Sequence, residues 1–298
     1  MNRIDTKTAL EENARAVNQM LDRLLPLDDE VPERRLEEAM RYAALGSGKR
    51  VRPFLVVTSA ALFNVPEDRA LRVGAAVEMV HAYSLVHDDL PCMDDDDLRR
   101  GKPTVHKKFD EATATLVGDA LLTRAFEVLA EDDTHPDSHV RIELVRALAA
   151  AAGPVGMVGG QMLDLLAEEK ALDVAEVTRL QRMKTGALIG FSAEAGAVLG
   201  RAPDTSRHAL HAYAHDLGLA FQIADDLLDV EGDADMVGKA TAKDAERGKS
   251  TFVSLLGVER AREQARMLAD QAAEHLEVFD EKADPLRDFV HFVVERQS

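Results

Sequence analysis

The sequence has little of several features that define other classes of protein. Its one cysteine, Cys92, excludes an internal disulfide and fits a reducing compartment. No uninterrupted apolar run reaches the roughly 18 residues that a membrane helix needs, and the first residues do not resemble a signal peptide. Basic residues are outnumbered, with 36 Lys and Arg against 54 Asp and Glu, which gives a net charge of −18. Because such an acidic surface repels polyanions, nucleic acid and anionic membranes are poor partners, and we expect a cytoplasmic protein.

The chain also lacks persistent strand alternation, internal repeats and a Gly/Ser-rich or Pro-rich linker. Its apolar residues, with Ala and Leu dominant, recur at spacings of three and four, which is typical of helices. The sequence therefore predicts an all-α single domain over residues 1–298, with roughly ten or more helices. We expect helices at residues 5–25, 32–45, 53–63, 66–89, 111–130, 140–152, 173–199, 204–230, 250–278 and 285–295.

The first concentration of charge follows the long apolar helix expected at residues 66–89. Six aspartates occupy positions 88, 89 and 94–97. On a regular helix a six-residue gap turns by about 240°, but Pro91 breaks the helix and can bring Asp88 and Asp94 to one site. Such hard oxygen ligands suit Mg²⁺, which usually also binds a substrate phosphate. The simpler alternative is a solvated acidic loop.

A second acidic motif, Asp225-Asp226-Leu-Leu-Asp229, also follows an apolar run. Asp225 and Asp229 are one helical turn apart and therefore share a face. One such pair is often no more than a polar helix end. Two such motifs, each at the end of an apolar helix, favour a metal site more strongly.

Basic residues accompany both motifs. Residues 46–53, GSGKRVRP, form a Gly-rich turn with three cations before a helix, and such a turn can present N–H groups and positive charge to phosphate. It is not a P-loop, because the required glycine spacing and the Ser or Thr after Gly-Lys are absent. Each cation alone is more often a surface residue. Their repeated placement beside acids favours carboxylates that hold metal ions and cations that hold the anion bridged by those ions.

His87 adjoins Asp88 and raises an alternative of a different class, a helical metal-dependent phosphohydrolase built on His-Asp pairs. That enzyme would need further histidine ligands. It would also leave the second acidic motif and the lysines that follow it without a role.

Several segments of the chain carry a family resemblance. They are GSGKRVRP (46–53), HAYSLVHDDLPCMDDDDLRRGKPTVH (81–106), GDALL (118–122), MVGGQMLDL (157–165), KTGALI (184–189), GLAFQIADDLLDVEGD (218–233), GK (238–239) and GKST (248–251). Together these segments resemble the trans-isoprenyl diphosphate synthases (polyprenyl synthetases), most closely the bacterial farnesyl diphosphate synthase type. Two details depart from the family pattern: Ala242 stands where glycine is common, and Phe252-Val253 replaces Tyr-Pro.

The resemblance implies an isoprenoid synthase fold whose two aspartate motifs face each other across a central cavity. It implies that isopentenyl diphosphate is condensed with dimethylallyl and then geranyl diphosphate to give farnesyl diphosphate (C15), with the C20 geranylgeranyl product as the alternative. It also implies Mg²⁺, three ions per active site, and a homodimer.

The resemblance assigns roles residue by residue. The implied metal ligands are Asp88, Asp94 and Asp225, with Asp89, Asp226 and Asp229 in support directly or through water. The allylic diphosphate would be bound by Arg99, Lys184, Gln222, Lys239 and Lys249. Isopentenyl diphosphate would be bound by Gly48, Lys49, Arg52, His81 and Arg100. Thr185 would lie near the reacting carbons, and the implied catalytic set is Asp88, Asp94, Asp225, Arg99, Lys184, Thr185 and Lys239.

Product length would be set beside the long helix before the first motif. Ser84 lies one turn before Asp88 and shares its face, so a helical wheel alone nominates Ser84 as the floor of the chain pocket. In the family, an aromatic residue five positions before the motif marks short-chain producers, and that position is Tyr83. The resemblance therefore favours Tyr83 and a C15 product.

Overall fold

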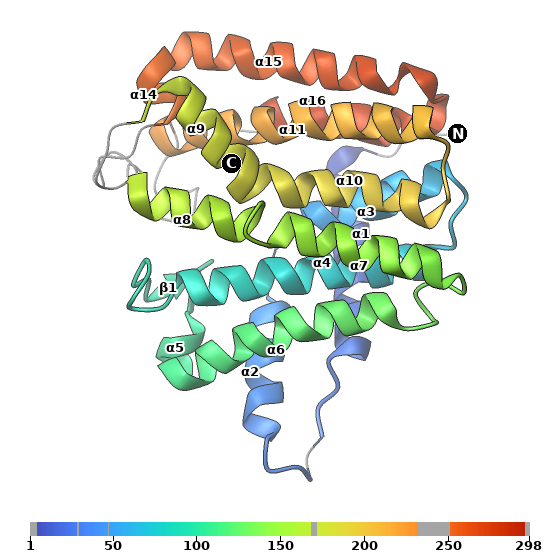
Figure 1. Ribbon diagram of the computed structural model, residues 1–298. Coiled ribbons are helices and arrows are strands. Elements are labelled where there is room, and N and C mark those ends of the chain that lie inside the picture. The colour runs from blue at the N-terminus through green and yellow to red at the C-terminus, as the bar shows by residue number, and fades with distance from the viewer. Residues whose placement is uncertain (1–4, 29, 47, 168–171, 232–250, 296–298) are drawn as a thin grey trace. The chain divides into compact units, whose positions relative to one another are not determined.

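The computed structural model describes residues 5–28, 30–46, 48–167, 172–231 and 251–295, and these are helical over most of their length (Figure 1). The all-α prediction is confirmed. Contacts divide the chain into two compact units, Met1–Val57 with Pro66–Val145, and Thr58–Val65 with Arg146–Ser298. That the whole chain forms one domain around a central cavity stays a prediction.

The first unit is organised by α4, Glu67–Asp88, most of which is buried. It packs against α1 (Thr6–Leu24), α2 (Arg34–Ala44) and α6 (Glu111–Ala130), and the ribbon shows α6 running alongside it (Figure 1). Because α4 is apolar nearly all round, it can be covered on several sides at once. The remaining elements are the first part of α3 (Val51–Leu62), β1 (Leu98–Arg99), β2 (Lys102–Pro103), α5 (Val105–Lys108) and the first part of α7 (Ser138–Ala152).

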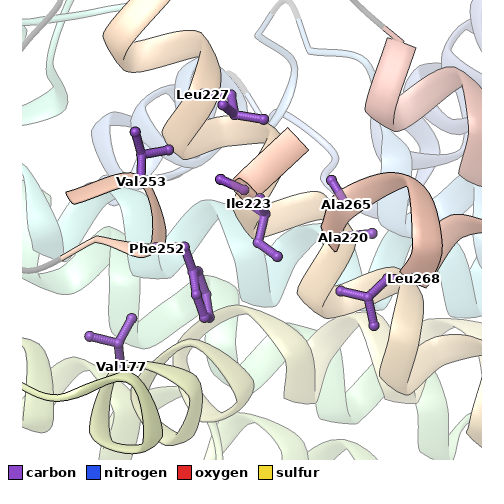
Figure 2. Close-up of a cluster of buried hydrophobic side chains, with 9 residues drawn as sticks. Val177, Ala220, Ile223, Leu227, Phe252, Val253, Ala265 and Leu268 are labelled. Atoms are coloured by element: carbon purple, nitrogen blue, oxygen red, sulfur yellow. The ribbon is translucent and has the colours of Figure 1, made fainter. Parts of the chain in front are cut away.

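The second unit is organised by α11, Asp204–Glu231, which packs along α15, Val258–His275. Figure 2 shows Phe252 and Val253 among the apolar side chains of this core, where Phe252 is 4% exposed. The pair that departs from the family's Tyr-Pro therefore contributes to packing. The other elements are the ends of α3 and α7, α8 (Met157–Ala167), α9 (Val174–Gln181), α10 (Ala187–Leu199), α14 (Phe252–Leu256) and α16 (Asp284–Glu295), with a π-helical turn at Arg182–Gly186 and 3₁₀ turns at Leu276–Val278 and Glu281–Ala283.

Some of the helices begin where a polar side chain caps them. The carboxylate of Asp110 accepts a hydrogen bond from Thr113 N at 2.7 Å, and α6 begins there. At α9 a capping box is present: Glu176 N donates to Asp173 at 2.8 Å, and Asp173 N donates back to the Glu176 carboxylate at 3.1 Å.

Three expectations need correction. The single helix expected at 250–278 is broken at Gly257, whose φ of 82° lies in the left-handed region that ends a helix. The helix expected at 173–199 contains the π-helical turn. The Gly-rich segment after residue 152, for which we predicted no helix, contributes α8.

The segment Ser138–Ala167 is the one stretch within the described ranges that is apolar and long enough to cross a membrane by composition. The sequence reading had found no such run. A turn at residues 153–156 divides the segment into α7 and α8. Only 28% of its most apolar window is buried, so these helices expose apolar surface.

Candidate active site

The first aspartate motif starts at the end of α4, where Asp88 is the last helical residue. The chain turns back after Pro91, and Asp94 N donates to the carbonyl oxygen of Asp88 at 2.8 Å. This main-chain bond brings the backbones of Asp88 and Asp94 together across the break. That their carboxylates share a metal site stays a prediction. Both residues are half-buried, so their carboxylates can meet a ligand from solvent.

Asp89 is the buried member of the motif, at 3% exposure, and Arg99 covers it. Arg99 Nε donates to Asp89 Oδ1 at 2.7 Å, and an Arg99 Nη lies 3.7 Å from Asp96. Burial raises the pKa of Asp89, while the hydrogen bond and charge of Arg99 act against that rise. In this structure Asp89 and Arg99 form a pair with each other.

Arg99 and Arg100 are placed by a β-hairpin that the sequence reading did not predict. β1 and β2 pair antiparallel, and the two residues between them, Arg100 and Gly101, have φ values of 52° and 74°. Two successive positive φ values make the tight turn whose twist matches a hairpin. The hairpin returns Arg100 towards Gly48, where an added Cβ would lie 2.5 Å from Arg100 Nη1. Gly48 therefore leaves room for this guanidinium.

A pocket in the first unit gathers several of the predicted anion-binding residues. His81, Arg99 and Arg100 line it together with the buried Glu78. Burial lowers the pKa of His81 well below its usual range, and nearby guanidiniums, Arg52 first among them, lower it further. His81 is therefore a neutral imidazole at neutral pH and can donate one N–H to an anion. Lys49 is exposed, and Gly48 and Arg52 are half-buried.

Arg50, the middle of the three cations in the Gly-rich turn, points inward and is not available to a ligand. Its Nη1 lies 2.5 Å from Glu78 Oε1, and the two side chains are 2% and 4% exposed. Its Nη2 donates to the carbonyl oxygens of Ala44 and Gly46 at 2.7 and 2.8 Å. Arg50, which was not among the predicted ligands, holds the turn. That Lys49 and Arg52 bind the diphosphate stays a prediction.

Replacing Arg50 with methionine should therefore cost about 3–5 kcal/mol in free energy of unfolding, because Glu78 would stay buried without its partner. Adding Glu78→Gln should recover part of that loss. Urea unfolding measures both, with Arg15→Met as the control, since Arg15 is 74% exposed and pairs with Glu12 at 4.0 Å. A loss no larger than that of the control would contradict the structural role.

In the second unit Lys184 and Thr185 lie in the π-helical turn Arg182–Gly186. A π-turn adds a residue to the helix and is often found at functional sites. Gly160 of α8 lies against this turn, since an added Cβ would be 2.2 Å from Lys184 N. Lys184 Nζ reaches Asp164 of α8 at 2.7 Å. Sequence reasoning missed Asp164, although it lies within the matching segment 157–165.

The second aspartate motif is on α11, and its three acids differ in exposure. Asp226 is 4% exposed, and its oxygens accept from Gln222 Nε2 at 3.0 Å and from Phe252 N at 2.9 Å. The hydroxyl of Thr185 donates to Gln222 Oε1 at 3.4 Å and extends this network of hydrogen bonds. Asp226 therefore joins α11 to the start of α14. Asp225 and Asp229 are half-buried and are better placed to meet a ligand.

The remaining predicted ligands, Lys239 and Lys249, lie outside the described residues, as does Ala242. Among the residues that the structure describes, no three His, Cys, Asp or Glu side chains converge to hold a metal by themselves. Mg²⁺ keeps several waters and usually binds through one or two carboxylates together with substrate phosphates. The donor chemistry at Asp88, Asp94, Asp225 and Asp229 suits that mode.

His87, on which the phosphohydrolase alternative depended, packs against α6. Its Nε2 lies 3.0 Å from the carbonyl oxygen of Thr115, and an added Cβ at Gly118 would be 1.9 Å from the same nitrogen. Because a carbonyl only accepts, Nε2 carries the proton and is not a metal ligand. The ring of Tyr83 stacks edge-on against His87, with centroids 5.8 Å apart.

The fold and these motifs define a class, helical enzymes that work on diphosphates, and comparisons with known proteins identify the family. A family model described as Polyprenyl synthetase matches residues 33–285. The farnesyl diphosphate synthase of Escherichia coli K12 is 44% identical over 303 positions, covering 99% of this chain and all of that one. That of Geobacillus stearothermophilus is 42% identical over 277 positions, covering 93% of each.

A solved apo structure of a FPP/GFPP synthase from Zymomonas mobilis is also similar. Its TM-score is 0.89 at 55% identity, covering 97% of this chain and 98% of that chain. The chain belongs to the polyprenyl synthetase family.

Proposed function

We propose that this protein is a trans-prenyltransferase that condenses isopentenyl diphosphate with dimethylallyl and then geranyl diphosphate to give farnesyl diphosphate. The observation that carries this proposal is the arrangement in the first unit, where the Asp88–Asp94 motif lies beside a pocket lined by His81, Arg99 and Arg100. Acids that suit a divalent metal and cations that suit a diphosphate stand together there. Farnesyl diphosphate synthases covering nearly the whole chain support the same reaction.

The isopentenyl site consists of Gly48, Lys49, Arg52, His81 and Arg100. A diphosphate bound without metal depends on direct charge-assisted hydrogen bonds, which guanidinium groups supply with fixed geometry. The neutral His81 adds an N–H donor without adding charge. Gly48 admits Arg100, and Arg50 shapes the turn beneath these ligands.

The allylic diphosphate is held by Arg99, Lys184, Gln222, Lys239 and Lys249, and its metals by Asp88, Asp94 and Asp225 with Asp89, Asp226 and Asp229 in support. When bound, Mg²⁺, which we propose as three ions, stabilises the negative charge that grows on the leaving diphosphate. The cationic side chains stabilise the same charge. In the structure two of these cations form ion pairs, Lys184 with Asp164 and Arg99 with Asp89.

Ionisation of the allylic C–O bond leaves a carbocation, and the double bond of isopentenyl diphosphate attacks it. Holding the two reactants in place is worth up to about 7–11 kcal/mol of the barrier in model systems. Thr185 stands near the reacting carbons in this proposal. The departing diphosphate takes the final proton, because none of the motif side chains is an evident base.

We further propose that the protein is a cytoplasmic homodimer that neither enters membranes nor binds nucleic acid. The exposed apolar residues Val158, Met162 and Leu166 recur every fourth position along α8 and share one face. Such a face is typical of a protein interface. Sedimentation should give a mass of about twice the 32.6 kDa of one chain, and a monomer mass at micromolar concentration would contradict the dimer.

The proposed reaction is tested by its stoichiometry. With Mg²⁺ and both substrates, one inorganic diphosphate should be released for each isopentenyl diphosphate consumed. Release of orthophosphate while isopentenyl diphosphate is not consumed would support the phosphohydrolase instead.

A further inference from the structure

The first aspartate motif ends in a loop, residues 94–97, whose four adjacent carboxylates repel one another. One side of this loop is tied to the end of α4, since Asp94 N donates to Asp88 O at 2.8 Å and Asp95 N donates to Leu90 O at 3.2 Å. The backbone of Asp95 is in the left-handed region, with φ of 50°. The other side of the loop, at Asp96 and Asp97, has a second support.

Thr104 supplies that support. It is 2% exposed, its N–H donates to Asp97 O at 3.0 Å, and its hydroxyl donates to Asp96 O at 2.9 Å. Thr104 precedes α5, and threonine in that position commonly caps the helix, yet its side chain makes no cap bond. Both of its donors are directed to the acidic loop.

His106 supports Thr104 from behind. Its Nδ1 lies 3.1 Å from the Thr104 hydroxyl oxygen. Because that hydroxyl already donates its proton to a carbonyl, Nδ1 must carry a proton and donate to it. The other ring nitrogen, Nε2, is buried and has no hydrogen-bond partner within the described residues. The Nδ1 bond is therefore the hydrogen bond that orients this ring.

We propose that Thr104, oriented by His106, is a positioning residue that holds the Asp94–Asp97 loop in the conformation that receives metal. The proposal rests on the proposed function. Thr104 acts through the main-chain carbonyl oxygens of Asp96 and Asp97. His106 Nδ1 donates to the Thr104 hydroxyl, and that hydroxyl donates to the carbonyl oxygen of Asp96, so the two hydrogen bonds run in one direction towards the loop backbone.

The test uses matched variants of the full-length protein. Thr104→Val keeps the shape of the side chain but loses the hydroxyl, and should raise the half-saturating Mg²⁺ concentration about three- to tenfold, as expected for one lost hydrogen bond. Thr104→Ser keeps the hydroxyl and should stay within about twofold of the parent.

Two substitutions of His106 give a second matched pair of variants. Asn places a donor where Nδ1 stands, whereas Gln places its amide near the position of Nε2. His106→Asn should therefore keep most of the Mg²⁺ affinity, and His106→Gln should behave like Thr104→Val. Equal losses in the two His106 variants would overturn the role given to Nδ1.

A second readout needs no turnover: the rise in Tm caused by Mg²⁺ with inorganic diphosphate should be smaller in Thr104→Val than in Thr104→Ser. A valine variant with lower Tm or turnover but unchanged Mg²⁺ dependence would show a purely structural role and overturn the proposal. If the parent protein binds Mg²⁺ and diphosphate but forms no carbon–carbon bond, the proposed function fails, while the comparison of variants by Tm still tests Thr104.

Discussion

Asp88→Ala and Asp225→Ala should each lower turnover by about three orders of magnitude or more, equivalent to about 4 kcal/mol of transition-state stabilisation. Both carboxylates are half-buried on helices, Asp88 at the end of α4 and Asp225 on α11. Removing either takes away a ligand for the metal that offsets charge on the leaving diphosphate. Neither side chain belongs to the buried core, so the helical fold should persist.

The measurement is steady-state turnover over a range of Mg²⁺ concentrations, with far-ultraviolet circular dichroism to check the fold. Asp97→Ala is the matched control, because Asp97 lies in the same acidic run but its side chain is 73% exposed beside Lys107. Its turnover should stay close to that of the parent. Near-normal turnover in both Asp88→Ala and Asp225→Ala, with Mg²⁺ still required, would contradict the assignment.

Tyr83→Ala should shift the main product from C15 to C20 or longer while carbon–carbon bond formation continues. The ring of Tyr83 is 6% exposed and lies edge-on against the ring of His87, and Tyr83 is five residues before Asp88, the last residue of α4. Its removal opens apolar volume of the kind that another isoprene unit can fill. The reaction at the diphosphate end is the same for every chain length, so the volume of the apolar pocket must set the length of the product.

Chromatography of the dephosphorylated products of parent and variant measures the shift. Ser84→Ala is the control: Ser84 donates to the carbonyl oxygen of His81 at 2.9 Å, and its loss frees little space. It should leave the C15 product unchanged. If Tyr83→Ala still stops at C15, Tyr83 is not the floor. If the parent already makes mainly C20, the geranylgeranyl alternative replaces the farnesyl one.

Several helices could be predicted because they have a local cause. Asp5 and the Asp173–Glu176 box begin their helices with side-chain caps, and the apolar spacing carries the helix on from there. The π-turn at Arg182–Gly186 could not be predicted in this way. One extra residue barely disturbs an apolar pattern of three and four, and the close contact of Gly160 with this turn comes from a segment more than twenty residues away.

The site could be predicted by residue type but not by orientation. The sequence does not distinguish Arg50 from its neighbours Lys49 and Arg52, which carry the same charge. Arg50 points inward because it pairs with the buried Glu78, which is distant in the chain. Asp225 and Asp226 are neighbours on one helix, yet their different faces leave one half-buried and enclose the other. Such differences depend on tertiary contacts, which a single sequence does not display.

The most direct test of the account is to incubate the purified protein with Mg²⁺, radiolabelled isopentenyl diphosphate and dimethylallyl diphosphate, and to size the labelled product. We predict a C15 chain carrying two isopentenyl units for each dimethylallyl unit. Absence of any product longer than C5, with orthophosphate released instead, would contradict the assignment as a prenyltransferase.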